Sequence, residues 1–190
     1  MLDRYIKFLY FLDEELNKMF SSQKPFIKCK VGCALCCKDG DFPMSELEYL
    51  NLLDYYRLLS GDLKNTIDNN IKTLLKSNNE ENYVCPFLVK DICSVYPVRP
   101  IICRTFGLIS FTKQGRKKIP FCVDMGLNYS EVFDKKSSKI IAKAPDGTEP
   151  NAYNIDRIFL RSKEFEQSFN IYFGEDKRMI DWLKDETWNV

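Results

Sequence analysis

Four of the eight cysteines in this chain lie close together, in the sequence Cys29-Lys-Val-Gly-Cys33-Ala-Leu-Cys36-Cys37. A thiolate is a soft anionic ligand, and several thiolates on one short loop are typical of a zinc site or an iron–sulfur cluster. The chain contains no histidine, so sulfur must hold any metal here, with an oxygen or an external ligand completing the coordination. This excludes mixed Cys/His zinc fingers, histidine-containing catalytic zinc sites and Cys–His nucleophile pairs.

The other four cysteines are spread more widely along the chain, at Cys85, Cys93, Cys103 and Cys122. Loop cysteines two or three positions apart can converge on one metal centre, whereas directly adjacent cysteines usually point apart. We therefore expect one of Cys36 and Cys37 to serve the first group and the other to reach a partner in the second. The pattern predicts one shared site, or two sites, tying the N-terminal loop to a later hairpin.

Three further segments accompany the cysteines: Cys85-Pro-Phe-Leu88, Cys93-Ser-Val-Tyr96 and Arg99-Pro-Ile-Ile-Cys-Arg104-Thr-Phe106. With Cys122 as the last cysteine, this ordered combination over roughly residues 29–125 resembles the cysteine-cluster proteins named for their CxxCxxCC motif. Members of that family are described as zinc- or iron-chelating domains and are often labelled iron–sulfur oxidoreductases. This chain departs from the family name in having three residues, rather than two, between the first two cysteines.

The resemblance implies that all eight cysteines are candidate metal ligands. These are Cys29, Cys33, Cys36, Cys37, Cys85, Cys93, Cys103 and Cys122. It does not imply one settled reaction. A flagellin lysine methylase carries a similar cysteine cluster, so the enzyme class is open between an iron–sulfur oxidoreductase and a methyl-transfer enzyme, acting on a small-molecule or protein substrate with an electron-transfer partner.

The first cysteine loop also fits the three-cysteine motif of radical S-adenosylmethionine enzymes. Those enzymes need a run of βα units to form a partial barrel, and this sequence shows no such alternation. Three cysteines at these spacings are weak support without that fold. We therefore favour a metal centre on a different fold.

The choice between metals rests on the spacing. Closely placed cysteines combined with long and short intervals fit a 4Fe–4S cluster better than two ordinary zinc knuckles, so we prefer the cluster and keep Zn²⁺ as the alternative. Zinc would make the site structural, a staple for a binding or adaptor module. Apolar residues near the cysteines are expected to shield a cluster from solvent: Phe87, Leu88, Ile101, Ile102 and Phe106.

Arg99 and Arg104 flank Cys103 and are the candidate catalytic residues. They are expected to offset thiolate charge, to donate hydrogen bonds to cluster sulfur or to bind an anionic substrate; a salt bridge to a surface carboxylate is the alternative.

Tyr96 is expected in the core. The basic residues between 113 and 118 are expected to form a solvated hairpin tip rather than a nucleic-acid contact.

Composition sets the remaining bounds. The 190 residues are long enough for one domain over 1–190, and 45% of them are hydrophobic, which argues against disorder. With 28 basic and 27 acidic residues the formal charge is +1, so charge gives no reason to expect nucleic-acid or membrane binding. Charges interrupt the aromatic N-terminal stretch, so we expect neither a membrane span nor a signal peptide there. We expect a cytoplasmic protein with reduced thiols rather than disulfides.

The elements that must position these residues are mainly helical. Apolar spacing predicts a helix over 2–20. The capping-box pattern at Ser45-Glu-Leu-Glu48 predicts a helix that runs to about residue 59 and is terminated by Gly61. A further helix is predicted to start near residue 62. A polar loop is expected over 77–82. A hairpin is predicted at 84–89 and 92–96, around Lys90-Asp91, and a second strand pair at 108–112 and 119–123.

Beyond the second strand pair, residues 134–152 are expected to form a surface excursion. A C-terminal helix is expected from about residue 155, with Ile158, Phe159, Phe165 and Phe169 facing inward, followed by a short helix at 179–183. The sequence therefore predicts a mostly helical α+β domain. Its core is expected to be irregular and cysteine-rich, with a short β-hairpin around the metal site.

Overall fold

The computed structural model describes residues 1–40, 42–77 and 82–184. Helices dominate and the strands are short, so the chain is α+β, as the sequence predicts. The chain divides into two compact units. Unit 1 comprises Met1–Leu2, Val31–Cys103 and Asn170–Val190, and unit 2 comprises Asp3–Lys30 and Arg104–Phe169.

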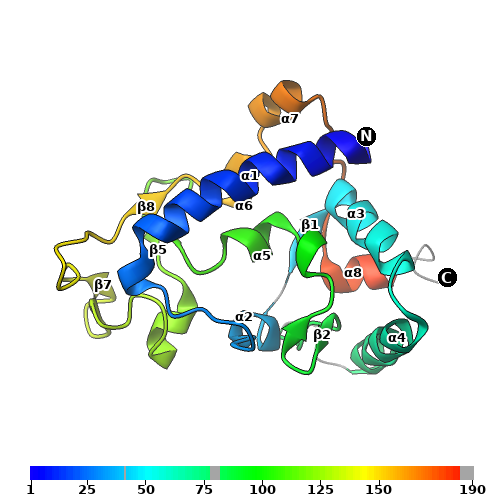
Figure 1. The fold of residues 1–190 in the computed structure, drawn as a ribbon, viewed down its shortest axis with the longest axis horizontal. Coiled ribbons are helices and arrows are strands. Elements are labelled where there is room, and N and C mark those ends of the chain that lie inside the picture. The colour runs from blue at the N-terminus through cyan, green and yellow to red at the C-terminus, as the bar shows by residue number, and fades with distance from the viewer. Residues whose placement is uncertain (41, 78–81, 185–190) are drawn as a thin grey trace. The chain divides into compact units, whose positions relative to one another are not determined.

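The α-helices, labelled in Figure 1 where there is room, are α1 (Leu2–Ser22), α2 (Leu35–Lys38), α3 (Glu46–Arg57), α4 (Gly61–Lys76), α5 (Ile101–Thr105), α6 (Arg157–Leu160), α7 (Lys163–Phe169) and α8 (Met179–Leu183). The 3-10 helices are η1 (Lys24–Phe26), η2 (Tyr96–Val98) and η3 (Phe121–Met125). The strands are β1 (Pro43–Ser45), β2 (Leu88–Val89), β3 (Ile92–Cys93), β4 (Ile109–Phe111), β5 (Lys117–Lys118), β6 (Phe133–Asp134), β7 (Lys139–Ile140), β8 (Ala152–Tyr153) and β9 (Asp176–Arg178).

In unit 1, helix α3 begins at the capping box that the sequence predicts. The Ser45 hydroxyl accepts the backbone N–H of Glu48 at 3.3 Å, and the Glu48 carboxylate accepts the backbone N–H of Ser45 at 2.7 Å. This exchange satisfies two amides at the helix start. The expectation that Gly61 ends this helix is wrong: α3 ends at Arg57, and Gly61 is the first residue of α4.

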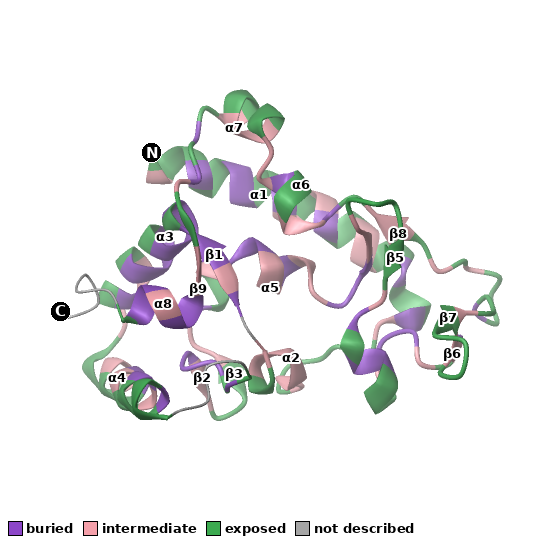
Figure 2. Cartoon of the chain, turned by 180° about the vertical axis from the view of Figure 1, so that it is seen from behind, coloured by how far each residue is buried: buried purple, intermediate pink, exposed green. Residues whose placement is uncertain are grey.

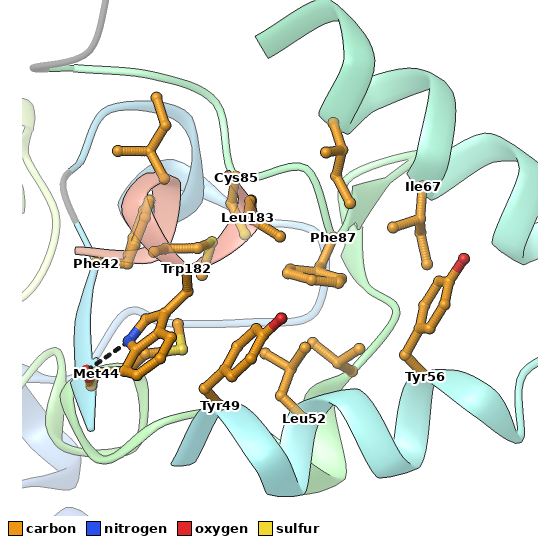
Figure 3. Close-up of a cluster of buried hydrophobic side chains, with 14 of the residues drawn as sticks. Phe42, Met44, Tyr49, Leu52, Tyr56, Ile67, Cys85, Phe87, Trp182 and Leu183 are labelled. Atoms are coloured by element: carbon orange, nitrogen blue, oxygen red, sulfur yellow. Dashed lines mark hydrogen bonds between the residues drawn. The ribbon is translucent and has the colours of Figure 1, made fainter. Parts of the chain in front are cut away.

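The core of unit 1 gathers around α3, α4 and α8, and Figure 2 shows buried residues along each of these helices. The Trp182 ring stacks on Tyr49 with centroids 4.8 Å apart, and its indole N–H donates to the carbonyl of Met44 at 3.0 Å. Figure 3 shows the two rings next to each other in this cluster. Such stacking contributes about 0.5–1.5 kcal/mol beyond the burial of area.

Two small sheets belong to unit 1. Strand β1 pairs antiparallel with β9, which the sequence does not predict, and β2 pairs with β3 in the predicted hairpin, although each of its strands is only two residues long. Lys90 and Asp91 both have positive φ, at 51° and 60°, as a two-residue hairpin turn of this twist requires. Of the polar loop expected over 77–82, residues 78–81 lie outside the described part of the chain.

In unit 2, the helix expected over 2–20 is confirmed as α1. It buries one face, formed by Tyr5, Phe8, Leu9, Leu12 and Leu16. The ring of Phe8 makes edge contacts with Phe165 and Phe169 of α7, at centroid distances of 6.0 and 5.1 Å.

The C-terminal region departs from its prediction. One helix from residue 155 is replaced by the short helices α6 and α7, and the final helix α8 is confirmed at 179–183. Ile158 and Phe159 are 48% and 47% exposed rather than inward-facing, because the inward position of α6 is taken by Leu160.

The remaining strands also lie in unit 2. Strand β4 pairs antiparallel with β5 and parallel with β8, in the order β5-β4-β8. The second strand expected at 119–123 is wrong: the partner of β4 is β5, which lies earlier at Lys117–Lys118, and most of the expected range forms the 3-10 helix η3. The excursion over 134–152 contains the end of the β6–β7 hairpin. Within the described residues, no helix combines the length and hydropathy needed to cross a membrane.

Candidate metal centre

All eight cysteines lie in the described part of the chain, and all are free thiols. Six of them belong to unit 1 and two, Cys29 and Cys122, to unit 2. The six in unit 1 are Cys33, Cys36, Cys37, Cys85, Cys93 and Cys103. The division cuts across the two sequence groups, because Cys85, Cys93 and Cys103 share a unit with Cys33 to Cys37.

The first cysteine loop reverses direction just before α2. Gly32 and Ala34 both have positive φ, at 82° and 49°, and Ala34 is the N-cap of α2. Helix α2 then carries Cys36 and Cys37, whose sulfur atoms lie 3.9 Å apart. The adjacent thiols therefore do not point fully apart, contrary to the sequence expectation.

A backbone hydrogen bond joins this loop to the second cysteine group. The N–H of Cys85 donates to the carbonyl oxygen of Cys37 at 2.7 Å. Cys85 is buried in the unit 1 core, where Figure 3 labels it close to Leu183. Cys37, Cys93 and Cys103 are half-buried and pack against the same hydrophobic cluster. The apolar core thus forms a common wall for cysteines from three separate segments.

The hairpin supplies Cys93, the last residue of β3. The N–H of Ser94 donates to the carbonyl of Phe87 at 2.9 Å and its hydroxyl donates to the same oxygen at 2.7 Å, which holds the two arms together beyond the strands. Lys38 of α2 forms an exposed ion pair with Asp91 at the hairpin turn, at 2.7 Å. Exposed ion pairs of this kind contribute little stability, so the hydrogen bonds between Ser94 and Phe87 are what fix the position of the hairpin arms.

Cys103 is carried by α5. The carboxylate of Glu48, itself 2% exposed, accepts the N–H of Ile101, the first residue of α5, at 2.8 Å. Of the apolar residues expected to shield the site, Phe87 and Ile101 are 1% and 0% exposed, while Leu88 is half-buried. Ile102 is half-buried as well. Of the unit 1 cysteines only Cys85 is fully buried, and the other five are partly exposed.

The thiols of unit 1 interact electrostatically. Burial raises the pKa of the Cys85 thiol well above its ordinary value, and the neighbouring Cys103, Cys93 and Cys36 raise it further. Burial is likewise the main cause of the raised pKa of Cys93 and of Cys103. For Cys36 the hydrogen bond with the Cys37 thiol is the main cause, followed by burial. Without a metal these thiols are protonated at neutral pH.

The charge of Arg99 acts on several of these thiols. Its positive charge lowers the pKa of Cys36, Cys93 and Cys103, against the larger effects of burial and of the Cys36–Cys37 hydrogen bond. Its guanidinium lies over the ring of Tyr96, 3.9 Å from the centroid. Tyr96 is 57% exposed, so the expectation that it lies in the core is wrong. The stack holds the Arg99 side chain in place.

Arg104 occupies a different environment. It belongs to unit 2, is 3% exposed and forms an ion pair with Asp13 of α1. This is an ion pair of the kind that the sequence analysis gives as the alternative to a role beside the cluster. Arg104 therefore has an ion-pair partner of its own, whereas the charge of Arg99 lowers the pKa of three cysteines.

The thiols of unit 1 suit a thiophilic metal by their chemistry. They are soft sulfur donors that lie against an apolar cluster, and a cation acts on them. The sulfurs are not drawn in to coordination distance. Across the described residues, no group of three or more cysteine, aspartate or glutamate side chains is close enough to hold a metal ion. Metal binding would therefore require the cysteine side chains to move closer together. Binding would then be coupled to a local folding step.

In unit 2, Cys29 has a polar partner that the sequence analysis missed. The side-chain amide of Asn128, which is 0% exposed, donates to the Cys29 sulfur at 3.2 Å. Asn128 lies beyond the cysteine motifs and no local pattern marks it. Cys122 is 3% exposed within η3.

Comparison with family models gives a match over residues 28–123, about half of the chain, to the family named CxxCxxCC and described as a putative zinc- or iron-chelating domain. All eight cysteines lie inside the matched residues. Comparison with curated proteins and comparison with solved structures each gave no match.

Proposed function

Because this chain belongs to the CxxCxxCC family of zinc- or iron-chelating domains, we propose that its cysteine thiolates hold a 4Fe–4S cluster used for electron transfer or group transfer. The observation that carries the proposal is the gathering of six cysteines in unit 1, four of which lie against one apolar cluster. A cluster of this kind takes one thiolate per iron. Cys36, Cys85, Cys93 and Cys103 are the ligands we assign first, because Cys36, Cys93 and Cys103 all raise the pKa of Cys85, and Cys36 and Cys93 also raise the pKa of Cys103.

Each part of unit 1 has a task in this proposal. The apolar wall that includes Phe87 and Ile101 excludes water, which together with hydrogen bonds to sulfur sets the reduction potential. Arg99 offsets the negative charge of the bound thiolates and is the residue placed to attract an anionic substrate or partner. The bound cluster would supply one-electron chemistry or an open iron for a ligand.

Zinc is the second candidate, and one distance favours it. The sulfur atoms of Cys36 and Cys37 are 3.9 Å apart, and four thiolates about 2.3 Å from one zinc ion have neighbouring sulfurs about 3.8 Å apart. A zinc ion at this position would hold the α2 loop against the hairpin and would carry no redox chemistry. In that case the protein would be an adaptor or binding module.

Metal analysis of protein purified without oxygen separates the two candidates. We expect brown protein with about four irons per chain and an absorption band near roughly 400 nm. Stoichiometric zinc without iron or sulfide would overturn the cluster and establish the zinc module, because a zinc–thiolate site is colourless there. A chain that holds neither metal would overturn both.

The remaining parts of the proposal concern the surroundings of the protein. The cytoplasm is the compartment we propose, because it keeps thiols reduced and available for metal. A redox or group-transfer centre also needs an electron-transfer partner and a small-molecule or protein substrate. Interaction with nucleic acid is not part of the proposal, because the formal charge of +1 gives no basic surplus.

A further inference from the structure

Unit 2 carries most of the positive charge of the chain. It contains 18 basic and 12 acidic residues, a formal +6, although the whole chain is only +1. Every residue of unit 2 lies in the described part of the chain. The small net charge of the whole chain therefore conceals a strongly basic unit, and the positions of its cations decide what that unit can attract.

Part of this charge is concentrated on two short hairpins. The β4–β5 turn and strand β5 together carry four cations, and the β6–β7 hairpin carries more. Six of these residues are exposed and form no ion pair with a described carboxylate. We call them the basic face, and they are Lys113, Arg116, Lys117, Lys118, Lys136 and Lys139.

The two hairpins rest on one hydrophobic cluster of unit 2. Ile119, which follows β5, and Ile140, the last residue of β7, both pack against it. The segment after β7 is linked to β5 by charge. The pKa of Glu149 is lowered mainly by Lys143, with which it forms an ion pair, and further by Lys117. Packing and charge therefore hold the two groups of cations as neighbours.

Two of the three acidic side chains between residues 119 and 140 already have partners. Glu131 forms an ion pair with Lys28 at 2.8 Å. Asp134 accepts the N–H and the hydroxyl of Ser137, at 3.0 and 2.5 Å, within the β6–β7 turn. The carboxylates nearest in sequence therefore do not neutralise the basic face.

Protection of a sheet edge accounts for only part of this charge. Lysines on an exposed edge strand prevent pairing with another chain, and β5 lies at the edge of the sheet β5-β4-β8. That explanation suits Lys117 and Lys118. It does not extend to Lys113, Arg116 and Lys136, which lie outside the strands.

The side chains around the cations indicate the kind of partner. Neither turn, over 113–116 or 135–138, contains an apolar side chain that could enter a membrane. Neither hairpin carries an exposed aromatic ring on which a nucleic-acid base could stack. A protein surface rich in carboxylates matches the face by charge alone.

We propose that the basic face of unit 2 binds an acidic surface of a protein partner, so that its six cations meet aspartate and glutamate carboxylates. A contact of this kind speeds association and weakens as salt is added. The inference goes beyond the proposed function and does not depend on which metal the chain holds.

The test uses the full chain with labelled poly-glutamate as the probe. Lys118→Glu combined with Lys139→Glu reverses one charge on each hairpin. The control combines Lys7→Glu with Lys163→Glu, which changes the net charge equally at exposed positions of α1 and α7. The competing probes are a single-stranded DNA oligonucleotide with the same number of charges and vesicles that contain phosphatidylserine. Fluorescence anisotropy measures the soluble probes, co-sedimentation measures the vesicles, and melting temperatures check that each variant is folded.

We expect the parent to bind poly-glutamate at low salt and to bind it more weakly at high salt. The variant of the basic face should bind about 10-fold or more weakly, and the control should stay within about twofold of the parent, because only the first pair of cations meets the probe. The neutral pair Lys118→Gln with Lys139→Gln repeats the comparison with a smaller change, and it should weaken binding about threefold.

Equal losses in the variant of the basic face and in the control would overturn the inference, because net charge alone would then explain binding. A parent chain that does not bind poly-glutamate at low salt would overturn it as well. Tighter binding of DNA or of vesicles than of poly-glutamate at the same salt concentration would assign the face to nucleic acid or to a membrane instead.

Discussion

The buried carboxylate of Glu48 accepts the backbone N–H of Ile101 at 2.8 Å, although the two residues are 53 positions apart in the chain. Its other oxygen accepts the backbone N–H and the hydroxyl of Ser45, each at 2.7 Å. One side chain therefore completes the start of α3 and fixes the first residue of α5, the helix that carries Cys103. The capping box therefore supports the segment that carries a candidate metal ligand as well as its own helix.

Comparing Glu48→Gln with Ser45→Ala should separate the two tasks of Glu48, because the Ser45 hydroxyl takes part only in capping α3. An amide has only one acceptor oxygen, so Glu48→Gln should leave a backbone N–H without its partner and lower the unfolding free energy by about 1–3 kcal/mol. Ser45→Ala should cost about 1 kcal/mol, as for loss of a helix cap. Urea unfolding of the metal-free chain measures both. Only Glu48→Gln should also reduce metal content; equal metal content in both variants would contradict a link from Glu48 to Cys103.

Arg99 should assist metal binding through its charge. Removing it in Arg99→Ala leaves the pKa of Cys36, Cys93 and Cys103 higher still, because its charge lowers all three. More free energy is then needed to deprotonate the thiols, and we expect metal affinity at neutral pH to fall about 10-fold or more. Arg99→Lys, which keeps the charge, should lose less. Competition with a chelator measures the affinities, and an Arg99→Ala variant that binds like the parent would show that the charge has no role.

Metal binding should release protons, and the affinity should rise with pH. Burial raises the pKa of Cys85, Cys93 and Cys103 above 9.0, so these thiols carry protons at neutral pH and must lose them on coordination. We expect about four protons per metal centre, one for each thiolate ligand. Calorimetric titration in buffers of different ionisation enthalpy counts them. Release of no protons would mean that other groups bind the metal.

The same pKa shifts predict how the metal-free chain responds to alkali. The pKa values of Cys85, Cys93 and Cys103 in the folded chain lie above the unfolded value of 9.0, so above that pH the unfolded chain has released protons that the folded chain keeps. The stabilisation from these neutral thiols is complete below pH 9.0 and is lost as the pH rises further. Urea unfolding on both sides of this pH should show the decline. The decline should be smaller in Cys85→Ser, which removes one of the titrating groups.

Gly107 and Gly115 form a matched pair for the backbone of unit 2. Both have positive φ, at 106° and 72°, but an added Cβ at Gly115 meets open space, whereas at Gly107 it would press on Asn128 and Cys29. Gly115→Ala should therefore cost about 1–2 kcal/mol, the strain of a left-handed alanine. Gly107→Ala should cost more, because its Cβ would also lie only 2.9 Å from Asn128 Nδ2. Equal melting temperatures for the two variants would contradict the close packing around Asn128.

Local patterns were enough to predict several parts of the fold. The capping box at Ser45, the amphipathic face of α1 and the helix at 179–183 all depend on residues within a turn or two of each other. The β2–β3 hairpin was also predicted, although its turn residues Lys90 and Asp91 are not the usual choice. These features follow from backbone preferences and short-range spacing, which a sequence displays directly.

The sequence by itself also limited the chemistry: it supplies eight thiols and no imidazole, so sulfur is the expected donor to any metal. Only the tertiary structure decided which cysteines share a unit, that Arg104 pairs with Asp13, and that Glu48 and Asn128 each bind a distant backbone N–H. Such contacts join residues separated by 50 positions or more, as for Glu48 and Ile101. They form when the core closes and are set by packing and hydrogen-bond satisfaction across the chain, which no short-range pattern records.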